Sequence, residues 1–130
     1  KHHGALGSYV VVHVNDTSRI NEIKNWLAMQ PGITEVFDKP TAVRVLEQPE
    51  DRIGDLVVMS GRDVVLGRRP RYHDLSALDG TLRSHGGRYE EMVPMIISHP
   101  LNKTYKMKAA RDPRNFDIFD FTINGTSGEE

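Results

Sequence analysis

Two runs of apolar, mostly β-branched residues constrain the fold of this chain most strongly, because such runs favour strands. They span residues 9–14 and 55–60, and the first is nearly continuous in apolar character, which predicts burial on both faces. Between them, residues 20–27 carry isoleucine and leucine at helical spacing, and a proline-glycine pair ends that helix. Residues 33–37 then alternate as another strand. The pattern predicts a strand-helix-strand unit with short connections in one sheet.

The remainder of this region extends the same pattern. Residues 41–46 follow a proline and predict a short helix, which two valines weaken. A glycine-arginine turn then leads into residues 63–66, which we expect to return as the hairpin partner of the strand over 55–60. Residues 9–66 therefore predict a small α+β lobe with a ferredoxin-like β-α-β-α-β-β order.

A second region, residues 73–125, is expected to hold a histidine loop, a return strand and a C-terminal helix. Residues 92–98 are apolar and predict the strand, with Pro94 placing its start at a sheet edge. A basic helical turn is expected over residues 103–110. The last helix would begin at Asn115 and end at Gly125. Its apolar face would carry Phe116, Phe119 and Ile123.

Composition excludes several classes of function. The net charge of −1 gives no sign of a nucleic-acid partner, and no apolar stretch reaches the roughly 20 residues that span a bilayer. The absence of cysteine excludes disulfides, thiolate ligands and a cysteine nucleophile. The start at Lys1 lacks the apolar segment of a secretory signal and lies almost directly before a strand. We therefore expect a cytoplasmic location, no membrane association, and a chain that is part of a longer one.

The segment Arg83-Ser84-His85-Gly86-Gly87 is the strongest candidate for chemistry. Two glycines after a histidine suit a tight loop, which can direct the imidazole toward a metal ion or a substrate. The alternative is a turn residue that only makes hydrogen bonds within the loop. A zinc site takes about three or four protein ligands, so any partners of His85 lie outside this motif.

The other histidines and the basic run are weaker candidates. Asp74 can orient the neighbouring His73, as carboxylates orient metal-bound imidazoles, or it can cap the following turn. His13 is expected to be a core histidine, and His99 to shape a turn. The pair His2-His3 is either a metal-binding pair or the remainder of a purification tag. Residues 68–71 form either a solvated turn or a contact with an anion or a partner.

Five stretches of the chain resemble phosphonoacetate hydrolase, a member of the alkaline phosphatase superfamily. They are Arg52–Ser60, His73–Asp79, Leu82–Gly87, the opening His3–Ser8 and the closing Asn115–Phe121. The resemblance runs through nearly the whole chain. It implies that residues 1–130 are the C-terminal portion of one larger enzyme domain with an alkaline phosphatase-like fold.

The resemblance also implies a function. The family uses two zinc ions and a threonine nucleophile to split the carbon–phosphorus bond of phosphonoacetate, giving acetate and phosphate. His85 matches the C-terminal metal-ligand histidine of the family. The nucleophile, the aspartate-histidine-glycine-methionine motif and the lysines that hold the substrate carboxylate have no counterpart here. The resemblance thus implies no catalytic residue in this chain, Zn²⁺ as the cofactor, and an inactive isolated chain.

A different class of function stays open. Residues 9–66 alone could form a free-standing ferredoxin-like module that binds a small ligand or a partner, which would leave the histidine loop without a role. If the chain belongs to a larger fold, apolar surface that the rest of that fold covers would be exposed. We expect a homo-oligomer for that reason.

Overall fold

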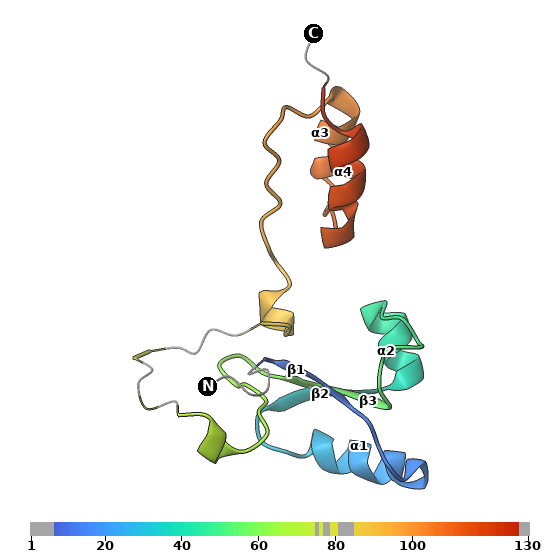
Figure 1. The fold of residues 1–130 in the computed structure, drawn as a ribbon, viewed down its shortest axis with the longest axis vertical. Coiled ribbons are helices and arrows are strands. Elements are labelled where there is room, and N and C mark those ends of the chain that lie inside the picture. The colour runs from blue at the N-terminus through green and yellow to red at the C-terminus, as the bar shows by residue number, and fades with distance from the viewer. Residues whose placement is uncertain (1–6, 75, 77–78, 81–84, 128–130) are drawn as a thin grey trace. The chain divides into compact units, whose positions relative to one another are not determined.

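The computed structural model describes residues 7–74, 76, 79–80 and 85–127, which fall into two compact units (Figure 1). The first unit is Lys1–Met92 and the second is Val93–Glu130. The described part of the histidine loop therefore belongs to the unit that contains the sheet. No helix of the described residues is long and apolar enough to cross a membrane.

A three-stranded antiparallel sheet forms the centre of the first unit. Its strands are β1 (Tyr9–Val12), β2 (Ile33–Asp38) and β3 (Leu56–Ser60), in the order β1-β3-β2. β3 runs antiparallel to both neighbours, so the outer strands β1 and β2 are parallel to each other. Every residue of β3 is buried, as expected for an apolar strand with partners at both edges. The predicted mixed α/β class, with strands 9–14, 33–37 and 55–60 in one sheet, is confirmed.

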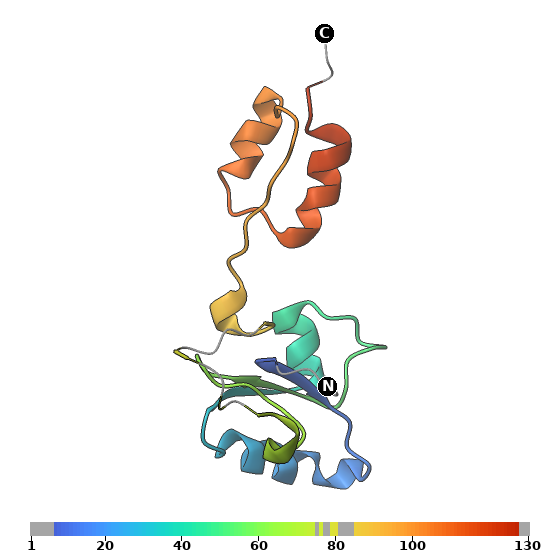
Figure 2. The same cartoon turned by 60° about the vertical axis from the view of Figure 1, so that its left-hand side comes forward.

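The two helices of this unit cover opposite faces of the sheet (Figures 1 and 2). The 3-10 helix η1 (Thr17–Arg19), which the Asp16 carboxylate caps, leads into α1 (Ile20–Ala28). On the other face, α2 (Lys39–Leu46) begins at Asp38, whose carboxylate accepts a hydrogen bond from the Thr41 amide at 3.1 Å. A carboxylate at this position satisfies an amide that the helix itself leaves free. Both helices were predicted.

The core lies between the sheet and α2. Ala42 of α2 packs with Val57 and Met59 of β3, and with Ile53 from the loop before that strand. These four side chains are buried, and half-buried residues of β1, β2 and α2 surround them. Burying a side chain such as valine contributes about 1.5–3 kcal/mol, so this cluster stabilises the unit.

The predicted hairpin strand over residues 63–66 is wrong, and the sheet order explains why. β3 already pairs with β1 and β2 at both edges, so it has no free edge for a hairpin partner. The chain turns after Gly61 and returns beside the start of β1, where the Leu66 amide donates to the Gly7 carbonyl at 2.8 Å. The lobe therefore has three strands instead of four.

The expected burial of β1 and of His13 is also corrected. β1 ends at Val12, and all four of its residues are only half-buried, because β1 is an edge strand. His13 follows the strand and is exposed, so it is not a core histidine. A strand at the edge of a sheet can be apolar along its whole length and still be only half-buried.

The second unit is a helical pair, seen side by side in Figure 2. α3 (Lys103–Ala109) begins at Asn102, and α4 (Ile118–Asn124) follows the 3-10 helix η4 (Asn115–Asp117) and ends at Gly125. Both helices were predicted, but Asn115 lies inside η4 and the α-helix itself begins at Ile118. Residues 92–98, in contrast, form no strand. Their apolar pattern and Pro94 were not enough to specify one without a sheet edge to pair with.

Tyr105 of α3 and Phe121 of α4 hold this pair together. Their rings meet edge to face with centroids 5.2 Å apart, and both residues are buried. The Tyr105 hydroxyl donates to the Asp120 carboxylate at 2.8 Å, and Lys108 lies 3.0 Å from the same carboxylate. Hydrogen bonds from Asn124, Tyr105 and Lys108 lower the pKa of Asp120 to about 2. These contacts connect the two helices within the unit.

Candidate metal-ligand loop

His85 lies at the start of the described part of the loop, next to the first residues of β1. The Ser8 amide donates a hydrogen bond to the His85 carbonyl at 2.9 Å. The imidazole is exposed and, among the described residues, has no hydrogen-bond partner. A Cβ atom built on Gly7 would lie 2.9 Å from Cε1 and 3.1 Å from Nδ1 of the ring. The ring therefore rests against the Gly7 backbone, where a larger residue would displace it.

Each of the two glycines after His85 suits its position for a different structural reason. Gly86 has a φ angle of +83°, which non-glycine residues rarely adopt. Gly87 approaches the start of β1 so closely that a Cβ atom on it would lie 2.6 Å from Ser8 Cβ. The histidine-glycine-glycine pattern thus produces a tight loop, as the sequence predicted, and the structure adds that this loop packs against the start of β1.

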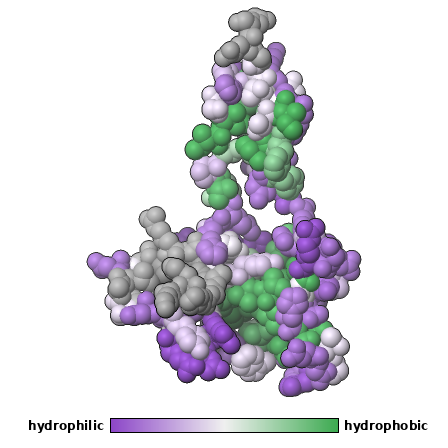
Figure 3. Space-filling model, viewed as in Figure 1, coloured by the Kyte–Doolittle hydropathy of each residue, from purple (hydrophilic) through white to green (hydrophobic). Residues whose placement is uncertain are grey.

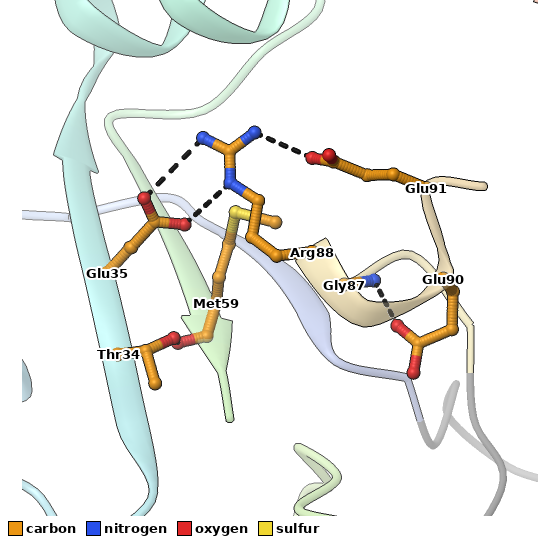
Figure 4. A network of polar contacts seen from close by, with 7 residues as sticks. All are labelled: Thr34, Glu35, Met59, Gly87, Arg88, Glu90 and Glu91. Carbon is orange, nitrogen blue, oxygen red and sulfur yellow. Dashed lines mark hydrogen bonds and ion pairs between the residues drawn. The ribbon is translucent and has the colours of Figure 1, made fainter. Parts of the chain in front are cut away.

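Directly after the glycines, the 3-10 helix η3 (Arg88–Glu90) carries a network of charged groups (Figure 4). Nε of Arg88 donates to Oε2 of Glu35 on β2 at 2.8 Å, and its NH1 donates to Oε1 of Glu91 at 2.7 Å. The Gly87 amide donates to the Glu90 carboxylate at 2.8 Å. Hydrogen bonds to Glu35 and Glu91 raise the pKa of Arg88, so its guanidinium stays charged. The loop is thereby connected to β2 as well as to β1.

The sequence did not indicate this network. Glu35 and Arg88 are 53 residues apart, and nothing in either neighbourhood marks them as partners. Glu90 carried a weak signal, because an acidic residue three positions after a loop residue can satisfy the free amide at a helix start. Only the chain topology brings β2 and the loop together.

The other candidate histidines belong to no group of three possible metal ligands among the described residues. The Asp74 carboxylate accepts hydrogen bonds from the amide and hydroxyl of Ser76, so it caps the turn, the second of its two interpretations. His73 has a buried Nε2 without a hydrogen-bond partner in the described part of the chain. His99 is exposed. His2 and His3, like Arg83 and Ser84, lie outside the described residues.

The donor set for a metal ion is incomplete in the described part of the chain. No group of three or more histidine, aspartate or glutamate side chains comes together there. The basic run is exposed at its arginines, and Arg71 stacks on the neighbouring Tyr72 ring at 4.9 Å. His85 is thus a single exposed imidazole on a well-anchored loop, and any metal site that uses it needs ligands from elsewhere.

Comparison with known proteins supports the resemblance seen in the sequence. No protein-family model matches this chain. Two crystal structures of phosphonoacetate hydrolase from Sinorhizobium meliloti 1021 are similar to it. The complex with phosphonoformate has 35% sequence identity and a TM-score of 0.66, and the complex with phosphonoacetate has 33% and 0.65.

Each of these matches covers 94% of this chain but 29% of the other chain. The chain therefore spans less than a third of the length of these relatives. The similarity extends over nearly all of its residues, which confirms the resemblance inferred from the sequence motifs. In sequence and in fold, this chain is similar to a part of phosphonoacetate hydrolase.

Proposed function

We propose that this chain is part of a zinc-dependent phosphonoacetate hydrolase and supplies His85 as one metal ligand. The observation that carries the proposal is the similarity to the Sinorhizobium enzyme over 94% of the chain, at 33–35% identity. That enzyme was crystallised with phosphonoacetate and with phosphonoformate. The reaction is hydrolysis of the carbon–phosphorus bond of phosphonoacetate to acetate and phosphate.

The geometry of the loop suits a ligand role. A neutral imidazole nitrogen is a common zinc ligand, and the exposed ring of His85 has no competing partner among the described residues. The hydrogen bond from the Ser8 amide to the His85 carbonyl holds the backbone at this position, and the ring lies beside the Gly7 backbone. Two bound zinc ions would stabilise the attacking and leaving oxygens of the reaction.

The remaining ligands and the nucleophile have to come from outside the described residues. One histidine does not hold a zinc ion, because such sites take about three or four protein ligands. Since the described part of the chain contains no cluster of three such side chains, we expect the isolated chain to be inactive. Its role is to present one ligand on a rigid lobe.

The test compares the isolated chain with the protein encoded by the complete reading frame that contains it. Acetate and phosphate release from phosphonoacetate is measured for both, with zinc supplied. We expect turnover by the complete protein and none by the 130-residue chain. Zinc-dependent turnover by the isolated chain, or a complete protein that leaves phosphonoacetate intact, would contradict the proposal.

An open apolar groove in the first unit supports a second candidate function, the binding of a small apolar ligand. The groove has a volume of about 510 Å³, within the range of ligand sites, and lies on the α1 face of the sheet. Its apolar lining includes Val10, Val12, Trp26, Leu27, Val58 and Leu66. A module of this kind would bind an apolar fluorescent dye with a dissociation constant that Trp26→Ala, a change at a largely exposed lining residue, weakens and His85→Ala leaves unchanged.

A further inference from the structure

The histidine loop is attached to the sheet at two places on either side of its glycines. On the N-terminal side, the His85 carbonyl accepts the Ser8 amide next to β1. On the C-terminal side, Arg88 binds Glu35 of β2. Because β1 and β2 are the two outer strands, the loop is connected to both edges of the sheet.

The attachment through Arg88 has the features of a specific interaction. The guanidinium lies between two carboxylates in Figure 4, one on β2 and one directly after η3. The side chains of Arg88 and Glu35 are 35% and 32% exposed, so water screens the pair only partly. Arginine suits this place because its planar group presents several donors in fixed directions, which a lysine does not.

Glu35 attaches this pair to the sheet. It lies on β2 opposite Met59 of β3, directly after an irregularity in the β2–β3 register. Met59 belongs to the buried core cluster and is drawn beside the network in Figure 4. A change at Glu35 or Arg88 would therefore release the loop while leaving the core residues in place.

We propose that Arg88 is a positioning residue for His85, which holds the loop against the sheet through Glu35 so that the imidazole is preorganised for metal binding. This inference rests on the proposed function of His85 as a zinc ligand. Groups that hold a ligand in place without touching the metal affect metal affinity by roughly 10–100-fold, so the role has a measurable consequence.

The first test is amide hydrogen exchange of the 130-residue chain without metal. Arg88→Gln and Glu35→Gln should each lower the protection of the Ser8 amide by roughly threefold to tenfold, because this amide donates to the His85 carbonyl. The amides of β3 should keep their protection. Arg88→Lys should recover part of the effect, since it keeps the charge without the two-sided geometry.

Arg19→Gln is the matched control. Arg19, the last residue of η1, makes a similar two-pronged contact at 2.9 and 2.7 Å, but its partner is Glu22 in the first turn of α1. It should leave the Ser8 amide unchanged. Equal loss of protection at Ser8 and throughout β3 in Arg88→Gln would show a general loss of stability and overturn the inference, as would no change at Ser8.

The second test measures zinc affinity in the protein from the complete reading frame, by competition with a chelating dye. Arg88→Gln should weaken zinc binding by roughly tenfold, and Arg19→Gln should not. Unchanged affinity in Arg88→Gln, together with zinc loss in His85→Ala, would overturn the positioning role alone. Unchanged zinc in His85→Ala would instead overturn the proposed function, whatever the exchange result.

Discussion

The two units of this chain differ in how they use their apolar residues. The sheet unit buries its central strand completely and packs α2 over it. In the helical unit, the buried hydrophobic residues among those described are Tyr105 and Phe121. Hydrophobic side chains lie open on the surface of the unit with α3 and α4 (Figure 3). Large exposed examples in this unit are Val93, Ile96, Met107, Phe116, Phe119 and Ile123.

This difference teaches that a helical apolar pattern predicts a helix more securely than it predicts burial. Phe119 and Ile123 fall on one face of α4, as the spacing indicated, but they are 71% and 76% exposed. The apolar run of β3 predicted a strand, and that strand is buried because the sheet supplies partners on both of its edges, whereas the burial expected for β1 is not found at the sheet edge. The stability of the two units should differ accordingly, and the following changes test that difference.

The largest effect is expected in the middle of the sheet. Leu56 is fully buried in β3, so Leu56→Ala should lower the free energy of unfolding of the sheet unit by about 3 kcal/mol through lost burial and a cavity. This free energy is measured by urea titration, with hydrogen exchange of the β3 amides as the reporter of the sheet unit. A change below about 0.5 kcal/mol would show that the buried strand β3 does not stabilise the sheet unit as its burial predicts.

A smaller effect is expected where the histidine loop packs on β1. Gly87→Ala would place a Cβ atom 2.6 Å from Ser8 Cβ, so loop or strand must shift, at about 2 kcal/mol. Gly61→Ala is the control, because its Cβ atom would approach the Thr34 methyl group only to 3.2 Å. Urea titration of both variants measures the cost. Equal costs would argue against a tightly packed loop.

The next effect concerns the helix that covers the core. Asp38 caps α2 and pairs with Lys24 at 2.6 Å, so Asp38→Ala should cost about 1 kcal/mol near pH 7. Hydrogen bonds from Lys24 and Thr41 lower the pKa of Asp38 from 3.8 to about 2. A lowered pKa stabilises the fold above pH about 4, and this contribution disappears as the pH falls through about 2.

The cost of Asp38→Ala should therefore shrink between pH about 4 and about 2, as measured by urea titration at each pH. Asp38→Asn is the matched variant, because asparagine caps helices about as well as aspartate but does not titrate. It should keep the cap and lose the pH dependence that this residue contributes. A cost of Asp38→Ala that stays constant over this range would contradict the lowered pKa.

The smallest effect is expected on the exposed face of α4. Phe119→Ala should change the stability of the helical unit by no more than about 0.5 kcal/mol, because the ring is mostly in solvent. Far-UV circular dichroism during thermal unfolding of the chain measures it. A loss of several kcal/mol would mean that another surface covers this face in solution, and the contrast between the two units would then disappear.

The sequence predicted most of the fold but little of the contacts around the site. Three strands and the helices expected over 20–27 and 41–46, which correspond to α1 and α2, followed from apolar spacing and from prolines and glycines, which are local signals. The hairpin partner at 63–66 and the strand at 92–98 failed because strand pairing depends on which sheet edges are free. Local sequence carries no information about that.

At the site, the histidine-glycine-glycine motif was visible because its backbone requirements are local. The contacts that hold the loop were not, since Gly7, Ser8 and Glu35 come from the start of the chain and from β2. The family resemblance pointed to His85 as a ligand without indicating what positions it. The contacts that position His85 depend on the long-range topology of the chain.

The most direct test of His85 as a zinc ligand is the zinc content of the protein from the complete reading frame, together with the intact mass of that protein. We expect a mass several times the 14.7 kDa of this chain and about two zinc ions per chain. His85→Ala should lower the zinc content toward about one, whereas His13→Ala, a change at another exposed histidine, should leave it unchanged. A zinc-free protein of 14.7 kDa, or equal zinc in both variants, would contradict the assignment of His85 as a metal ligand.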